Sequence, residues 1–241
     1  MVNQHARSAD RDTGRPAEIL EKLMLADWHE GLALQLGGST DADISDAAKV
    51  EFYDRNAAVY DEDMEVYYEY TGATQTANAL HKYLKGNLDA KILDVGGGTG
   101  LVIKKLKDLA PYKNADGLDP AGEMLILGKQ NGLYDNIFPQ CFTLDSDIPS
   151  NSYDAVCSSG AYVPGHIKAA TISKLHDIVK PGGYIIIVMR KSYTDTDADL
   201  IQLLPLIGEM VTCGKVQLIE QNTFEKYFKE LEGLRIVLQK L

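Results

Sequence analysis

The stretch Lys91-Ile-Leu-Asp-Val-Gly-Gly-Gly-Thr-Gly100 decides the fold of this chain. Its first half is a short apolar run, which is typical of a strand buried on both faces. Its second half is rich in glycine, which lets the backbone turn tightly and lets a ligand approach main-chain N–H groups. Residues 100–109 have helical spacing, so a helix should begin there with free donors and partial positive charge at its start. The stretch therefore predicts a strand, a ligand-binding loop and a helix.

The alternation of short apolar runs with helical spacing continues along the chain. The further expected strands are 115–118, 154–158 and 184–189, and the further expected helices are 121–130 and 166–179. Strands that alternate with helices of this length indicate a parallel sheet. Residues 46–85 are also expected to be helical, with a break near Thr71 and Gly72. We therefore predict an α/β domain over 46–241, preceded by a partly helical N-terminal extension over 1–45.

The spacing of the glycines limits the ligand that the loop can bind. A dinucleotide fingerprint needs GxGxxG, but its third glycine position is Leu101 when counted from Gly96 and Ile103 when counted from Gly98. A Walker loop needs GxxxxGK followed by Ser or Thr, and the sequence contains no such string. The pattern that remains is Asp94 followed by glycine at every second position, ending at Gly100.

A second acid, Asp119, ends the second expected strand nineteen residues after Gly100. A carboxylate at that point can accept hydrogen bonds from both hydroxyls of a ribose. Enzymes that use NAD place an acid similarly, and an acid before a helix can also serve as its N-cap. Asp119 therefore indicates a nucleoside ligand only together with other motifs.

Four further motifs follow the same order as those of a known family. They are Phe52-Tyr-Asp-Arg-Asn-Ala-Ala-Val-Tyr-Asp61, Gly117-Leu-Asp-Pro-Ala-Gly-Glu-Met-Leu125, Asn151-Ser-Tyr-Asp-Ala-Val-Cys-Ser-Ser-Gly160 and Val179-Lys-Pro-Gly-Gly183. With them, residues 46–190 resemble the class I S-adenosylmethionine-dependent methyltransferases, and specifically the Williams–Beuren-region methyltransferase-like proteins. The resemblance implies a Rossmann-like fold, with a seven-stranded, mostly parallel sheet, helices on both faces and an antiparallel last strand. The extension and the part past about residue 195 match that group poorly.

The resemblance also implies that the cofactor is S-adenosyl-L-methionine and that particular residues bind it. In the adenine segment, either Thr143 and Leu144 contact the base through main-chain atoms, or Asp145 accepts its amino group. Tyr53 and Tyr60 are seven residues apart and share one helical face, from which they either cover the cofactor or pack the helix on the domain. The implied cofactor-binding residues are Tyr53, Tyr60, Gly96, Gly97, Gly98, Gly100, Asp119, Pro120, Thr143, Leu144 and Ser159.

The expected reaction is an in-line transfer of the sulfonium methyl group to a small-molecule acceptor. A sulfonium is a good leaving group, so the protein needs chiefly to align acceptor and methyl group and to exclude water. His166 is the one candidate for a general base, and an exposed helix start is the alternative reading of it. Two other functions stay open: a protein that binds S-adenosylmethionine without catalysis and acts through a partner, and a nicotinamide-dependent oxidoreductase.

Charge and cysteine content narrow the partners and the location. The chain has 35 acidic and 24 basic side chains, a net charge of −11, which disfavours nucleic acid and anionic membranes. Ten acids fall within 41–70, where Tyr67, Tyr68 and Tyr70 also gather, and they hint at a cationic or aromatic acceptor. No metal site is expected. Three cysteines without CxxC spacing favour free thiols and a cytoplasmic protein. The extension is a candidate contact for a homodimer.

Overall fold

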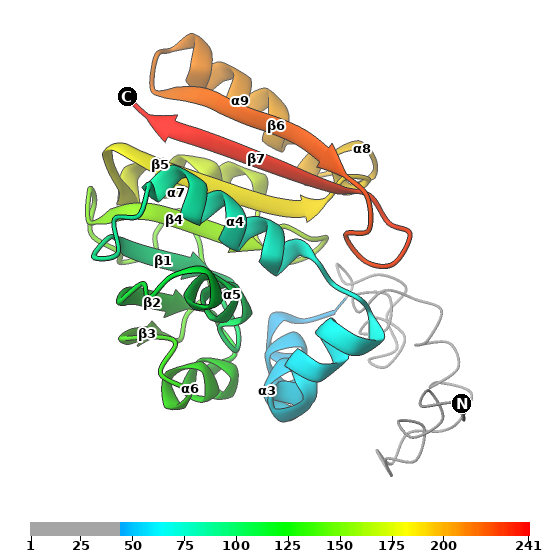
Figure 1. Cartoon of the computed structure of the whole chain (residues 1–241). Helices are drawn as coiled ribbons and strands as arrows, with labels where there is room; N and C mark the ends of the chain where they lie inside the picture. Colours follow the sequence, from blue (N-terminus) through cyan, green and yellow to red (C-terminus); the bar gives the residue numbers. More distant parts are fainter. Residues whose placement is uncertain (1–43) are drawn as a thin grey trace, which may run out of the picture.

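The computed structural model describes residues 44–241, which form a single sheet flanked by helices (Figure 1). The expectations for the extension over 1–45, namely its partly helical character and its homodimer contact, fall almost entirely outside the described residues. The sheet has seven strands in the order β3-β2-β1-β4-β5-β7-β6. Their bounds are β1 (Lys91–Val95), β2 (Asn114–Leu118), β3 (Asn136–Phe138), β4 (Tyr153–Ser159), β5 (Val179–Arg190), β6 (Val216–Phe224) and β7 (Gly233–Lys240).

The direction of the strands confirms the predicted Rossmann-like sheet. β1, β2, β3, β4 and β5 pair in parallel, whereas β7 runs antiparallel to both of its neighbours, β5 and β6. β6 and β7 are joined by the short connection 225–232, and a connection of that length can only bring the second strand back antiparallel. The predicted antiparallel last strand is therefore present.

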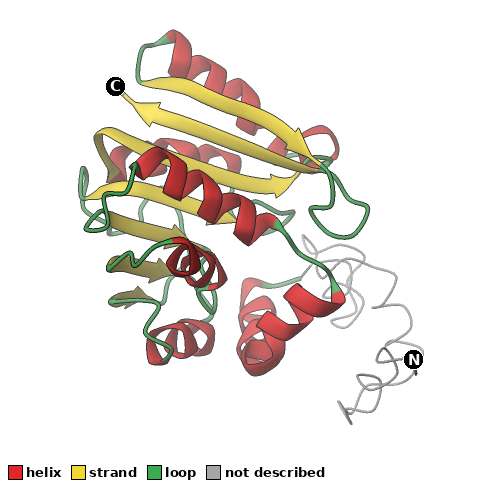
Figure 2. Ribbon diagram, in the orientation of Figure 1, coloured by secondary structure: helices red, strands yellow, loops and turns green. Residues whose placement is uncertain are grey.

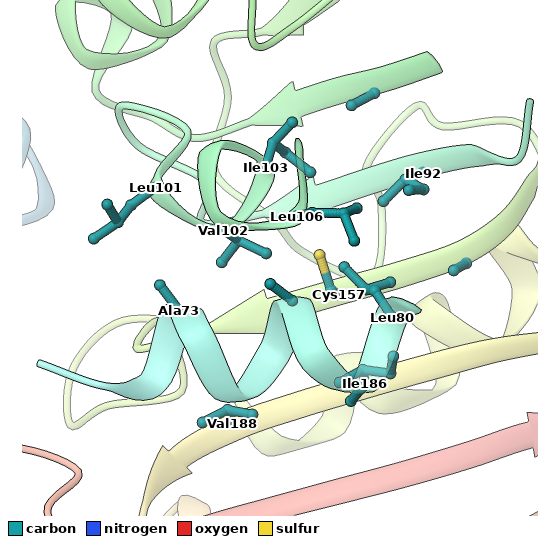
Figure 3. Close-up of a cluster of buried hydrophobic side chains, with 14 of the residues drawn as sticks. Ala73, Leu80, Ile92, Leu101, Val102, Ile103, Leu106, Cys157, Ile186 and Val188 are labelled. Carbon is teal, nitrogen blue, oxygen red and sulfur yellow. The ribbon is translucent and has the colours of Figure 1, made fainter. Parts of the chain in front are cut away.

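Helices cover both faces of the sheet (Figures 1 and 2). On one face α4 (Gly72–Leu84) and α5 (Leu101–Leu109) bury their apolar sides against the strands, and on the other α7 (Ile172–Ile178) and α9 (Leu203–Thr212) do so. Successive residues of a strand point to opposite faces. Accordingly, Ile186 and Val188 of β5 join the α4–α5 cluster of Figure 3, while Ile187 belongs to the cluster on the α7 face. The apolar residues of β5 therefore contribute to the hydrophobic clusters on both faces of the sheet.

The predicted elements before residue 160 match the structure closely, including α6 (Gly122–Gln130). The expected helix 166–179 is shorter: it consists of η4 (Ala169–Thr171) and α7, and the preceding residues form a loop. In this loop the N–H of His166 donates to Val163 O at 3.1 Å and that of Ile167 to Ala161 O at 3.3 Å, so these residues take up turn hydrogen bonds in place of a helix. Past residue 190 the structure adds α8 (Tyr193–Thr196), η5 (Leu200–Gln202), α9, β6 and β7.

None of the helices within residues 44–241 is long and apolar enough to cross a bilayer.

The chain segment before the sheet forms a lid over one end of it. This lid is α3 (Asp46–Glu62), which Ser45 caps through Ala48 N, followed by the π-helical η3 (Asp63–Tyr67). Figure 1 shows α3 beyond the carboxyl end of β1 and next to α6. The Asp54 carboxylate accepts a hydrogen bond from the N–H of Glu123, at the start of α6, at 2.9 Å. The lid is therefore fixed to a neighbouring helix end.

Candidate functional site

A cavity of about 290 Å³ lies between the lid and the carboxyl ends of β1, β2 and β4. Ligands of open α/β sheets bind at this edge, where the order of the strands reverses between β1 and β4. The volume is close to the lower end of the range for small-molecule sites, roughly 300–1,000 Å³. The fold therefore places a cavity of small-molecule size at the position that the glycine loop predicted.

The glycine loop uses its own N–H groups to hold its shape. The N–H groups of Gly96 and Gly97 both donate to Leu118 O, at 2.7 and 3.2 Å, and Gly98 N donates to Asp119 Oδ2 at 3.1 Å. We expected these amides to face a ligand, and the structure corrects that expectation. The donors are taken up because the loop must be joined to the end of β2, so the glycines contribute chiefly space.

Two positions show why this loop needs glycine. Gly96 has φ of +68°, and a Cβ added to it would lie 2.3 Å from Cβ of Ala161. At Gly98 an added Cβ would meet nothing closer than Met124, at 3.7 Å, so the loop surface there is open toward the cavity. Gly100 does not line the cavity; it caps the start of α5 with φ of +91°. Of the four predicted loop glycines, Gly96, Gly97 and Gly98 therefore form the wall of the site.

Asp119 lies at the end of β2 on the wall of the cavity. Its Oδ1 accepts from Ala121 N at 2.9 Å, and its Oδ2 accepts from Gly98 N at 3.1 Å. Desolvation raises the pKa of its carboxyl to about 6. Each carboxylate oxygen keeps a further lone pair, so the group can order the loop and accept two ligand hydroxyls at once. Asp119 is not the N-cap of α6, which is Ala121, but its position on the cavity wall is compatible with binding a ligand.

Asp94, the acid before the glycines, lies fully buried beneath the loop. Its Oδ2 is 3.0 Å from Tyr134 Oη, and its Oδ1 is 3.5 Å from Cys157 Sγ. Burial raises the pKa of this carboxyl to about 6. Because its neighbours are donors from the protein itself, Asp94 acts as the floor that holds the loop in place.

Aromatic side chains cover the cavity. Tyr53 and Tyr60 both line it from α3, with their rings edge to face and centroids 6.4 Å apart. Tyr70 lines it from the segment before α4, and its Oη is 2.7 Å from Oγ of Ser159 at the end of β4. Burial raises the pKa of Tyr60 well above its usual range and that of Tyr70 to about 12. These phenols are therefore neutral at pH 7 and present aromatic faces and O–H groups.

The segment expected to contact adenine reaches the cavity only in part. Thr143 lines it, as does Pro120, and Phe142 is a lining residue that the sequence reasoning missed. Leu144 does not line the cavity, and the residue is 53% exposed. Asp145 is exposed and does not line it either. The register of this irregular segment carries no periodic signal, which is why sequence reasoning could not choose among these neighbours.

A polar cluster lies on the lid side of the cavity, and the sequence analysis predicted only His166 of it. Lys49 Nζ is 2.9 Å from Asp46 Oδ1 and also donates to Gly165 O. His166 lines the cavity, with Nδ1 3.0 Å from Pro164 O and Nε2 3.4 Å from Tyr53 Oη. The signal for Lys49 was available, because it precedes Tyr53 by four residues and so shares its helical face.

The cavity shows no sign of a metal centre. Within residues 44–241, no group of three or more His, Cys, Asp or Glu side chains could hold a metal ion. Cys141, Cys157 and Cys213 are free.

Comparisons with known proteins agree with this geometry. Residues 92–183 match the family described as a methyltransferase domain. The chain is 34% identical over 148 residues to human methyltransferase-like protein 27 and 27% identical over 133 residues to the ubiquinone/menaquinone biosynthesis C-methyltransferase UbiE of Coxiella burnetii. These matches cover 60% and 50% of this chain, and the chain spans only 58% and 53% of those relatives.

A solved structure extends the likeness over most of the chain. It is an S-adenosylmethionine-dependent methyltransferase from Leishmania major, with a TM-score of 0.58 and 17% identity, and the match covers 88% of this chain and 91% of that one. At that identity the likeness concerns the fold alone. Residues 92–183 therefore resemble a methyltransferase domain, and the chain has the fold of a solved S-adenosylmethionine-dependent methyltransferase.

Proposed function

We propose that this protein transfers a methyl group from S-adenosyl-L-methionine to a small-molecule acceptor. The observation that carries the proposal is the cavity, which joins the glycine loop, Asp119 and an aromatic lid in one site. The curated relatives are methyltransferases by name, and one of them is a C-methyltransferase, so carbon is among the acceptor atoms to be tested.

The residues of the cavity fit the cofactor. Asp119 offers carboxylate oxygens to the ribose, and Pro120 and Phe142 offer apolar surfaces to the adenine. Gly98 leaves space against the loop, as the contact distances of an added Cβ show. When bound, S-adenosylmethionine supplies an electrophilic methyl group on a positively charged sulfur. The face of Tyr60 or another lining ring favours such a cation, by about 0.5–2 kcal/mol.

The chain's own residues would align the acceptor and remove its proton. α3 covers one side of the cavity, which limits the access of water and restricts the motion of a bound molecule. Alignment of this kind can contribute roughly 7–11 kcal/mol. A carbonyl oxygen only accepts, so the contact with Pro164 O requires a proton on Nδ1 of His166. Nε2 is then an acceptor in the neutral ring, and it is the atom that would take a proton from the acceptor.

Binding experiments test the proposal and its two alternatives. Calorimetry should show that S-adenosylhomocysteine binds and that NADH does not; the reverse result would support the nicotinamide-dependent oxidoreductase. Incubation with methyl-labelled S-adenosylmethionine and a metabolite extract should then transfer label to a small molecule. Cofactor binding without any transfer would favour the non-catalytic binding protein that acts through a partner. The cytoplasmic location stays a prediction.

A further inference from the structure

One wall of the cavity carries a buried positive charge. Lys49 lies on the cavity face of α3, and only 7% of its side chain is exposed. Its ammonium group has three N–H donors. One contacts Asp46 Oδ1 at 2.9 Å, and another contacts Gly165 O. These contacts leave a donor for a molecule in the cavity.

The wall around Lys49 lies directly against the glycine loop. Lys49 contacts the carbonyl of Gly165, the residue before His166, and Tyr53, one turn further along α3, reaches His166 Nε2 at 3.4 Å. The same loop packs on Gly96, where an added Cβ would lie 2.3 Å from Cβ of Ala161. The amine, phenol and imidazole therefore share the part of the cavity that borders the loop.

Among the acids of the lid, Asp46 forms an ion pair with Lys49 at 2.9 Å. Among the acids of residues 44–70, Asp46 lines the cavity, and its side chain is 79% exposed, so water screens its charge. Asp54 is bonded to α6, Asp61 to Thr99, and Glu65 is paired with Lys104 and Lys105. Asp54, Asp61 and Glu65 therefore serve to attach the lid to the rest of the domain.

We infer that Lys49, His166 and Tyr53 form a recognition site for an acceptor that carries a negatively charged oxygen group, such as a carboxylate or a phenolate. The ammonium of Lys49 donates to the anion, whereas His166 Nε2, which carries a lone pair, accepts from Tyr53 or from a neutral O–H group of the acceptor. The inference rests on the proposed function, in that the molecule recognised is the methyl acceptor.

Three small molecules of similar size and shape, which differ in charge, test whether the site recognises a negative group. The full chain, saturated with S-adenosylhomocysteine, is titrated by NMR or calorimetry with benzoate, benzamide and benzylamine, which differ in carrying a negative, a neutral or a positive group. Benzoate should bind roughly tenfold more tightly than benzamide, as expected for one charge-assisted hydrogen bond, and benzylamine should bind least. If benzoate fails to bind, or binds no better than benzamide, the inference is wrong.

Variants separate recognition of the anion from a purely structural role of Lys49. Lys49→Met should abolish the preference for benzoate and leave benzamide binding unchanged, whereas Lys49→Arg should keep the preference. Asp46→Asn removes the competing charge, so benzoate binding should hold or strengthen; a structural latch between the two residues would instead make Asp46→Asn and Lys49→Met weaken all three probes alike.

A control and a prior measurement complete the test. Lys113 forms an exposed ion pair with Asp89 at 2.9 Å and does not line the cavity. Lys113→Met therefore makes the same chemical change elsewhere and should alter none of the three affinities. S-adenosylhomocysteine binding is measured first, because its absence would refute the proposed function itself, whereas failure of the charge preference refutes only the role of Lys49.

Discussion

Replacing Asp119 by alanine is the most direct test of the cofactor site. The substitution removes both carboxylate oxygens, which now accept from Ala121 N at 2.9 Å and from Gly98 N at 3.1 Å. Under the proposed function the same oxygens also receive the two ribose hydroxyls. The variant therefore loses the acceptors of the ligand and, in addition, a constraint on the glycine loop.

The expected loss of affinity follows from these contacts. A hydrogen bond to a charged group contributes about 1.5–3 kcal/mol, and two such bonds to the ribose, partly replaced by water, give an expected loss of about 2–4 kcal/mol. At about 1.4 kcal/mol per factor of ten, the dissociation constant of S-adenosylhomocysteine should rise roughly 30- to 700-fold. Calorimetry measures this directly, and circular dichroism shows whether the variant is folded.

A matched control distinguishes ligand contacts from general effects of losing an acid. Asp135 accepts a backbone hydrogen bond from Ala115 N at 3.2 Å and does not line the cavity. Asp135→Ala should therefore leave S-adenosylhomocysteine affinity unchanged. A folded Asp119→Ala protein that binds S-adenosylhomocysteine within about twofold of the unmodified chain would refute the role of this carboxylate, since one charged hydrogen bond alone is expected to exceed that effect.

Three further predictions follow from the same site. Because desolvation raises the pKa of Asp119 to about 6, lowering the pH from 8 to 5 should protonate it and weaken S-adenosylhomocysteine binding; calorimetry across this range should show the fall, and Asp119→Asn should remove most of it. Gly96→Ala should lower the free energy of unfolding by about 2–4 kcal/mol in urea denaturation, because it combines a left-handed backbone with a 2.3 Å clash against Ala161; an unchanged midpoint would contradict this. Asp54→Ala should speed S-adenosylhomocysteine release, measured by stopped-flow, by roughly 2- to 30-fold, because the lid loses a helix-capping contact with Glu123 that contributes about 0.5–2 kcal/mol. Asp54→Asn keeps the acceptor oxygen and should release the ligand at nearly the original rate.

The sequence determined the framework of the fold and the glycine loop. The strand at residues 91–95 was predicted with its observed bounds, because an apolar run that ends in glycines allows few other structures. Asp119 and the loop were identified by the spacing of polar groups after strands, which is a local property of the chain. Helical periodicity placed Tyr53 and Tyr60 on one face, the family resemblance suggested that they cover the cofactor, and both line the cavity.

Only the tertiary structure shows which distant residues contact one another at the cavity. The loop amides are used within the protein because Leu118 O and Asp119 happen to lie beside them, and that neighbour relation arises only when β1 and β2 pair. Likewise, Lys49 and Gly165 are far apart in sequence, and only the docking of α3 over the strand ends brings them together. Periodicity indicates which face of a helix or strand is buried. It does not indicate which residues pack on that face, because those residues come from distant segments of the chain. The contacts between distant segments therefore determine which charged groups line the cavity.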